Sequence, residues 1–192
     1  MKYVLIAAIF FCLSSSGYAQ IKPIYFIGDS ITTNKAEATS YGVSGKLSTE
    51  NLYVLKMYDL NDNLLLTGFY KDEKLTIPHG RFLLYEDIDI FNEQNNTNFY
   101  MKDKYRFLSE QGDYADGKKI ARWVCFFPDG KIFSITNYIE GLKHGEFKVF
   151  NRRGKVVTSG NYQLGLKNGE WTYDTGRKEV YMNDILTSRK EN

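Results

Sequence analysis

Beyond residue 50, large apolar side chains alternate with polar ones over short stretches of the chain. Thr172 separates Trp171 from Tyr173, and residues 147–149 repeat this pattern around a lysine. Successive side chains of a β-strand point to opposite faces, so the alternation predicts strands with one aromatic, more buried face. Dipeptides such as Asn-Gly and Asp-Gly between these stretches are typical of hairpin turns.

The alternating stretches recur every 24 residues. The segment 137–147 aligns with 161–171 position by position, a further copy lies at 112–123, and a looser one covers 68–82. A fixed period of this length is the signature of repeat proteins, in which each unit packs on its neighbours. The interval between the looser copy at 68–82 and the copy at 112–123 is longer than 24 residues, which implies an insertion around 86–110.

The positions of glycine locate the turns between these strands. Asn168–Gly169 supplies the two positive-φ positions that a tight turn of type I′ demands, and Asp129–Gly130 and Arg153–Gly154 mark the next turn of each repeat. Each repeat is therefore predicted to be a hairpin. The predicted fold is all-β: one elongated, twisted antiparallel sheet built from stacked hairpins.

A second set of glycines stands two residues before the tyrosine of the returning strand, at Gly68, Gly112 and Gly160. We expect a glycine at this position to leave room for a neighbouring aromatic ring to lie over the backbone. Composition agrees with an all-β chain, because 16% of the residues are aromatic and tyrosine and phenylalanine favour a half-buried sheet surface.

The N-terminus has the pattern of a secretory signal peptide. Lys2 precedes a short apolar run, and the small residues around Ala19 suit cleavage that leaves Gln20 as the first residue. The apolar run is too short to span a membrane as a helix, so we expect export to the periplasm or beyond the cell. The chain is then divided as follows: signal peptide 1–19, lead-in segment 20–50, hairpin repeats 51–182 with the insertion around 86–110, and C-terminal tail 183–192.

The best copy of the repeat, Gly160–Trp171, matches every fixed position of the pattern Gly-x-Tyr-x-x-Gly-x-Lys-x-Gly-x-Trp. It resembles MORN repeats, and more closely the YwqK-type repeat, over about residues 112–178. The segment 24–41 also resembles the lead-in of exported Bacteroidota members of that group. Departures from the pattern in the other copies are Thr136, Phe147 and Ala121.

This resemblance implies contacts with proteins or lipids and assigns no catalytic residue. The YwqK-type group carries an antitoxin label, but a signal peptide conflicts with a cytosolic antitoxin, so we do not transfer that label.

The charged residues do not point to a particular class of partner. The chain has 25 basic and 23 acidic residues, a net charge of +2, with the two signs interspersed. No basic stripe indicates nucleic-acid binding. Removal of the signal peptide would leave Cys125 as the single cysteine, which excludes an internal disulfide. We expect Cys125 to be a small buried apolar residue and not a reactive thiol.

The strongest enzymatic pattern is Gly28–Asp29–Ser30. It resembles the first block of SGNH/GDSL esterases, in which the serine is the nucleophile and needs a histidine base. Those enzymes place Asp-x-x-His near the C-terminus, whereas the last histidine here is His144, preceded three positions earlier by Gly141. The esterase interpretation is therefore disfavoured.

The only histidines, His79 and His144, each precede a glycine of the repeat, where Asn168 stands in the best copy. We expect both to be turn residues, because histidine tolerates positive φ. No metal-ligand cluster, nucleotide-binding loop or other cofactor motif occurs. The sequence thus predicts a non-enzymatic protein, either a protein-binding or scaffold module of the cell envelope or, alternatively, a module that binds membrane lipid.

Overall fold

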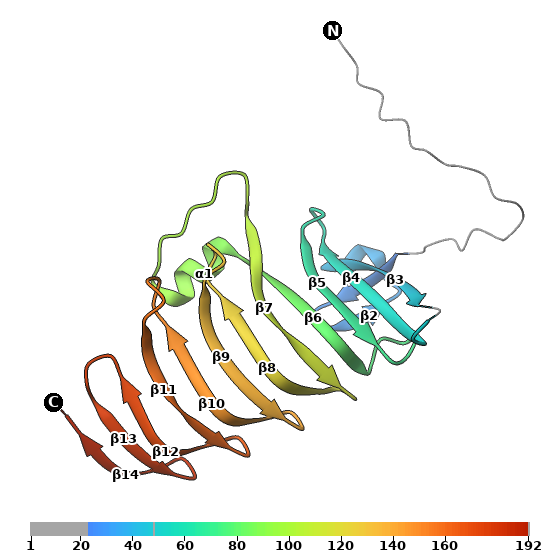
Figure 1. Ribbon diagram of the computed structural model, residues 1–192. Coiled ribbons are helices and arrows are strands. Elements are labelled where there is room, and N and C mark those ends of the chain that lie inside the picture. Colours follow the sequence, from blue (N-terminus) through green and yellow to red (C-terminus); the bar gives the residue numbers. More distant parts are fainter. Residues whose placement is uncertain (1–22, 48, 192) are drawn as a thin grey trace, which may run out of the picture.

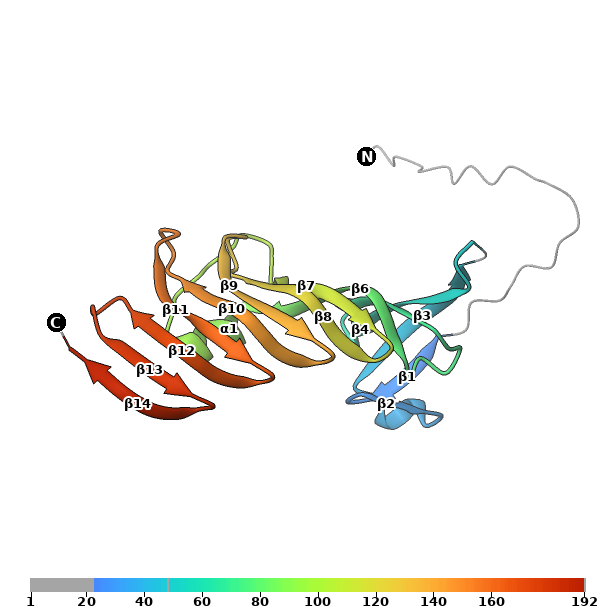
Figure 2. The ribbon, with the colours of Figure 1, turned by 60° about the horizontal axis from the view of Figure 1, so that its bottom comes forward.

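The computed structural model describes residues 23–47 and 49–191, which form one open, twisted antiparallel sheet of 14 strands (Figure 1). From β3 to β14 each strand pairs with the next one in the chain, and β1 lies between β2 and β3. Turning the molecule shows the successive hairpins side by side along an elongated body (Figure 2). The predicted all-β class and hairpin-repeat architecture are confirmed.

The elements in chain order are β1 (Ile24–Ile27), β2 (Ser30–Thr32), the 3-10 helix η1 (Lys35–Glu37), β3 (Ser40–Leu47), β4 (Leu52–Asp59), β5 (Leu64–Tyr70), β6 (Pro78–Asp87), α1 (Ile88–Asn95), β7 (Arg106–Ala115), β8 (Lys118–Phe126), β9 (Ile132–Ile139), β10 (Leu142–Phe150), β11 (Val156–Gln163), β12 (Leu166–Tyr173), β13 (Lys178–Met182) and β14 (Ile185–Lys190).

The 24-residue period is present in the backbone as well as in the sequence. Asp116, Glu140 and Leu164 all have φ near +50° and each is followed by a glycine with positive φ. These pairs form two-residue turns at one end of the strands. We call the side of the sheet along which these turns lie the short-turn edge, as distinct from the outer strands β2 and β14. The opposite, long-turn edge carries five-residue turns such as 127–131 and 151–155.

The turn expected at Asn168–Gly169 is wrong. Both residues lie inside β12, and the two-residue turn is Leu164–Gly165. Gly169 does have positive φ, 75°, but in a bulge: the four-residue step from Asn168 to Thr172 faces a two-residue step in β11. Asn-Gly is the better turn sequence, yet the bulge is what brings the following tryptophan over the neighbouring strand.

The expected role of the second set of glycines is confirmed. A Cβ atom added at Gly112 would lie 2.1 Å from the indole of Trp123, and one at Gly160 would lie 2.3 Å from the indole of Trp171. Gly68 stands in the same relation to the ring of Phe82. Each glycine therefore lets a large ring lie directly on the backbone of the adjacent strand.

These rings belong to a row of aromatic side chains that we call the aromatic ladder. Within each of its two runs, Tyr70 to Tyr138 and Phe147 to Tyr181, successive ring centres lie 4.7–6.3 Å apart and edge to face, an arrangement favourable for aromatic pairs. The repeat lysines cover it, with the Lys119 ammonium 3.8 Å from the Trp123 ring centre. The members are Tyr70, Phe82, Tyr114, Trp123 and Tyr138, followed by Phe147, Tyr162, Trp171 and Tyr181.

The predicted insertion lies between β6 and β7 and begins with a helix. Its polar run 92–98 starts inside α1, which Asp87 caps by accepting hydrogen bonds from the Asp89 and Ile90 amides. The helix forms because Phe91 packs among phenylalanine rings from the loop and the sheet. This second apolar cluster consists of Ile88, Phe91, Phe99, Phe107 and Phe127.

The sheet continues across both outer boundaries of the expected repeat region. Strand β3, within the segment 20–50, pairs with β4, and β14, within 183–192, pairs with β13. The lead-in and the tail thus both contribute strands. The predicted signal peptide, 1–19, and the new N-terminus at Gln20 lie outside the described residues.

Candidate functional site

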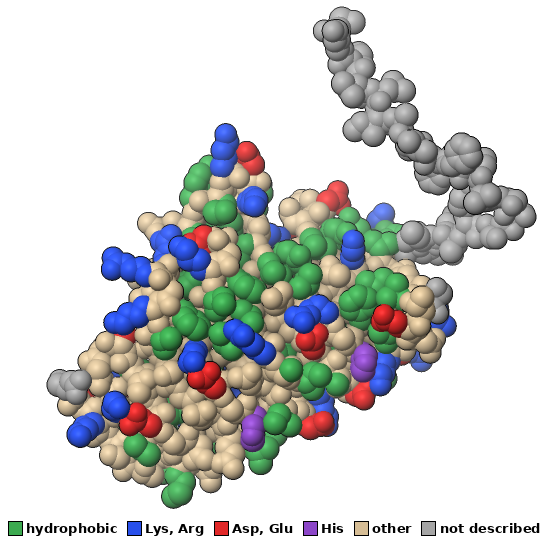
Figure 3. All heavy atoms as spheres, viewed as in Figure 1, with side chains coloured by type: hydrophobic (Ala, Val, Ile, Leu, Met, Phe, Trp, Pro, Cys, Tyr) green, Lys and Arg blue, Asp and Glu red, His purple; other side chains and the backbone are tan. Residues whose placement is uncertain are grey.

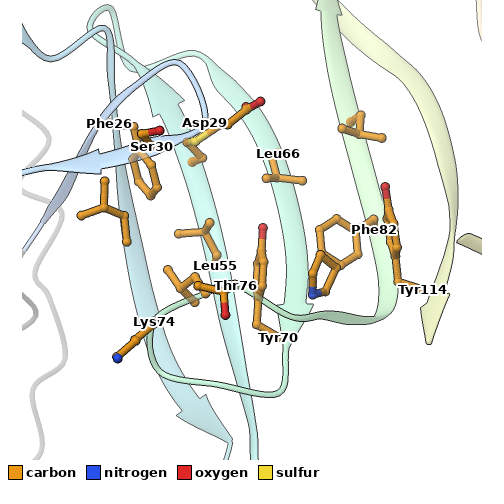
Figure 4. Close-up of a pocket in the computed structure, with 15 residues that line it drawn as sticks. Phe26, Asp29, Ser30, Leu55, Leu66, Tyr70, Lys74, Thr76, Phe82 and Tyr114 are labelled. Carbon is orange, nitrogen blue, oxygen red and sulfur yellow. The ribbon is translucent and has the colours of Figure 1, made fainter. Parts of the chain in front are cut away.

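In the Gly28–Asp29–Ser30 pattern, the first two residues form the turn between β1 and the short β2, and Ser30 begins β2. Gly28 has φ +57° and its amide donates to the Thr39 hydroxyl, 3.1 Å away. Ser30 is exposed and lines a pocket of about 660 Å³ (Figure 4). No histidine lines this pocket, so within the described residues Ser30 lacks the base of a serine esterase.

The two histidines link consecutive hairpins. Nδ1 of His79 accepts from the Asp116 amide and Nδ1 of His144 accepts from the Leu164 amide, both at 3.4 Å. Each histidine Nδ1 atom thus accepts a hydrogen bond from the first residue of the short turn of the following hairpin. The interpretation of the histidines as turn residues is wrong, because both lie in strands and the glycines after them carry the positive φ.

Sites for a metal ion or a reactive thiol are not apparent in the described part of the chain. No group of three or more histidine, cysteine, aspartate or glutamate side chains is placed there to hold a metal. Cys125 is a free, half-buried cysteine in β8, and burial raises the pKa of its thiol. A protonated, partly buried thiol is a poor nucleophile.

An exposed row of large apolar side chains follows the short-turn edge over three consecutive turns. Each member is 40–69% exposed. The turns are neighbours: the Gly165 amide donates to the Lys143 carbonyl at 2.8 Å, and the Asp184 amide to the Lys167 carbonyl at 3.0 Å. Green side chains lie along this lower edge in Figure 3. We call this row the apolar strip; its members are Ile139, Leu142, Leu164, Leu166, Met182 and Ile185.

A group of cations and tyrosines gathers on the long-turn edge, beside α1. Arg152 lies with its guanidinium 4.0 Å from the Phe99 ring centre, so the turn 151–155 contacts the inserted loop. In that loop Tyr100 and Tyr105 are 85% and 74% exposed. Five cations there form no ion pair within the described residues, and we call them, with the two tyrosines, the basic–aromatic region: Lys102, Lys104, Arg152, Arg153 and Lys155.

The fold and these surfaces define a single-sheet β-hairpin repeat protein with a side pocket. No protein-family model matches the chain, and no curated protein is similar to it. The similarity to MORN and YwqK-type repeats therefore stays an interpretation of the residues. Within the described residues, no helix combines the length and the apolar character needed to cross a membrane.

Sequence reasoning missed the apolar strip and the pocket. The strip had a signal, because Ile139 and Leu142 flank one short-turn glycine and Leu164 and Leu166 flank the next. Apolar residues beside a turn are unusual, since turns lie at the surface. The pocket had no such signal in the sequence. Its walls come from the lead-in segment and from the loop 71–77, and the repeat pattern gives no indication that these two segments lie close together.

Proposed function

We propose that this protein is an exported, non-catalytic module that binds another envelope or secreted protein along its apolar strip. The observation that supports this most is the row of six exposed apolar side chains on three consecutive turns. Contiguous exposed apolar surface with polar surroundings marks interaction sites in soluble proteins. Repeat proteins commonly use such extended surfaces to hold a partner.

The test combines in-cell crosslinking of the tagged protein with mass spectrometry of what it captures. The informative variant is Leu164→Asn, because asparagine removes the apolar side chain and tolerates the φ of +49° better than leucine does. Its fold should therefore be unharmed while capture of the partner falls severalfold.

The matched control is Leu60→Asn. Leu60 is also 60% exposed, but it lies in a turn of the long-turn edge, between β4 and β5. Capture should remain at the wild-type level in this variant. Equal capture by wild type and Leu164→Asn would contradict binding through the apolar strip.

A second candidate function, binding to membrane lipid, is favoured by the basic–aromatic region. Unpaired cations attract anionic headgroups, and exposed tyrosines suit the membrane interface. Vesicles of phosphatidylglycerol should then bind the protein in a salt-sensitive manner, and Arg153→Glu should weaken that binding. Equal binding to phosphatidylcholine vesicles, or none to either, would exclude this candidate.

A further inference from the structure

The side pocket lies at the N-terminal end of the aromatic ladder. The β1–β2 turn forms one wall and the loop 71–77 between β5 and β6 another, over a floor of apolar side chains (Figure 4). Phe26, Leu55, Tyr70 and Phe82 supply the floor and are each less than 10% exposed. A concave volume of about 660 Å³ with an apolar floor suits a small ligand.

The pocket carries one charge of each sign. Among its lining residues only Asp29 and Lys74 are charged, and Figure 4 places them at opposite ends with the apolar side chains between them. Neither forms an ion pair within the described residues. Both charges are therefore free to meet a ligand.

Two of the other three charged groups of the loop 71–77 are already engaged, whereas the exposed Glu73 forms no ion pair within the described residues and does not line the pocket. The Asp72 carboxylate accepts hydrogen bonds from the amides of Thr76 and Ile77, and Lys71 pairs with Asp116. These contacts hold the loop 71–77 in place, so Lys74 is presented from an ordered segment.

A hydroxyl stands between the two charges. Tyr70 points its phenol oxygen toward the middle of the pocket in Figure 4, and burial raises its pKa to about 12. The phenol is therefore neutral and able to donate at physiological pH. Within the described residues this hydroxyl has no hydrogen-bond partner, so a ligand carbonyl could accept from it.

We propose that the pocket binds a short apolar peptide with free termini. Its ammonium lies against Asp29, its carboxylate against Lys74, its side chains on the apolar floor, and a peptide carbonyl accepts from Tyr70. Charge complementarity favours a peptide over a fatty acid, because a fatty acid would leave Asp29 without a partner. This inference does not rest on the protein partner proposed above, which would bind along the short-turn edge.

Calorimetric titration with the tripeptide Leu-Phe-Leu tests the proposal. N-terminal acetylation of the peptide should weaken binding about two- to fivefold for the wild type, the size expected of an accessible ion pair. It should have no effect on Asp29→Asn. C-terminal amidation should behave in the same way with respect to Lys74→Gln, so that each pair of changes forms a double-mutant cycle.

Lys56→Gln is the matched control, because Lys56 lies between the pocket residues Leu55 and Met57 on β4 and so points to the other face of the sheet. Peptide binding to this variant should equal that of wild type. Three outcomes would overturn the proposal: no binding of the tripeptide to wild type, an acetylation effect that persists in Asp29→Asn, or dodecanoate binding as tight as the peptide and insensitive to Asp29→Asn.

Discussion

At the scale of single residues, the contact between a strand glycine and the ring laid on it decides whether a repeat can form. In the last full repeat, Trp171 is 2% exposed and covers Gly160 so closely that no side chain fits between them. The glycine is required for close approach and not for an unusual backbone, because its φ lies outside the positive region. The same argument applies to Gly112 beneath Trp123.

Gly160→Ala should lower the free energy of unfolding by about 1–3 kcal/mol, because the new methyl group must displace a well-packed indole. Chemical denaturation measures this change. Gly45→Ala is the control: Gly45 also lies in a strand, but an added Cβ there meets nothing within 4 Å. This control should be neutral or slightly stabilising, and equal losses in the two variants would refute the proposed contact.

Ala121 shows the opposite situation, a residue that is too large for its backbone. Its φ is +54°, at the bulge position where Gly145 and Gly169 stand in the following repeats. Ala121→Gly should therefore raise the free energy of unfolding by about 1 kcal/mol, since glycine adopts this conformation without strain. The reciprocal change, Gly145→Ala, should lower it by a similar amount. A destabilising Ala121→Gly would show that the bulge geometry differs from this description.

At the scale of elements, the final hairpin is held by a buried carboxylate. Glu179 in β13 is 2% exposed, accepts from the Tyr181 hydroxyl at 2.8 Å and pairs with Arg189 of β14 at 2.8 Å. Hydrogen bonds from Tyr181 and Tyr173, together with Arg189 and Arg177, lower the pKa of Glu179 to about 2. The folded state thus favours the ionised form.

Because the pKa of Glu179 is lowered in the folded state, the free energy of unfolding should decrease as the pH falls. Because the unfolded carboxyl titrates near 4.5, the contribution of Glu179 is complete above that pH and is lost as pH falls toward about 2. Glu179→Gln should lower stability at neutral pH and flatten the loss of stability between these two values. Denaturation midpoints measured from pH 7 to pH 2 give the comparison, and parallel curves for the two proteins would contradict the assignment.

At the scale of the whole molecule, an open sheet must protect its two edge strands from pairing with other chains. One edge, β2, has only three residues. The other, β14, is bulged at Thr187, since Ser188 faces Val180 while Leu186 faces Tyr181, and it ends in Arg189 and Lys190. Short strands, bulges and cations are the usual means of protecting an edge.

We also predict that the N-terminal segment of the chain is removed on export. If residues 1–19 are a signal peptide, the exported protein begins at Gln20, because the small residues at the end of the apolar run suit cleavage after Ala19. N-terminal sequencing and intact mass of the protein from its own host measure this directly. A full-length chain retained in the cytosol would overturn both the cleavage site and the proposed envelope role.

The hairpin class, the 24-residue period and the glycines that lie beneath aromatic rings could all be predicted from the amino-acid sequence. These features depend on local alternation and on residue size, which repeat along the chain and can be compared copy by copy. Gly160 and Trp171 are an example: the glycine is the only residue type that leaves room for an indole, so the pairing could be inferred from their recurrence.

The position of each turn, the helix of the insertion and the charges that remain unpaired depend instead on contacts between distant parts of the chain. Asn168–Gly169 is the better turn by residue preference, but packing of Trp171 on β11 moves the turn to Leu164–Gly165 and leaves a bulge behind. Asp29 and Lys74 are 45 positions apart in the chain and share a pocket only because β1 pairs beside β3. Such outcomes depend on the sum of distant contacts, which no local pattern contains.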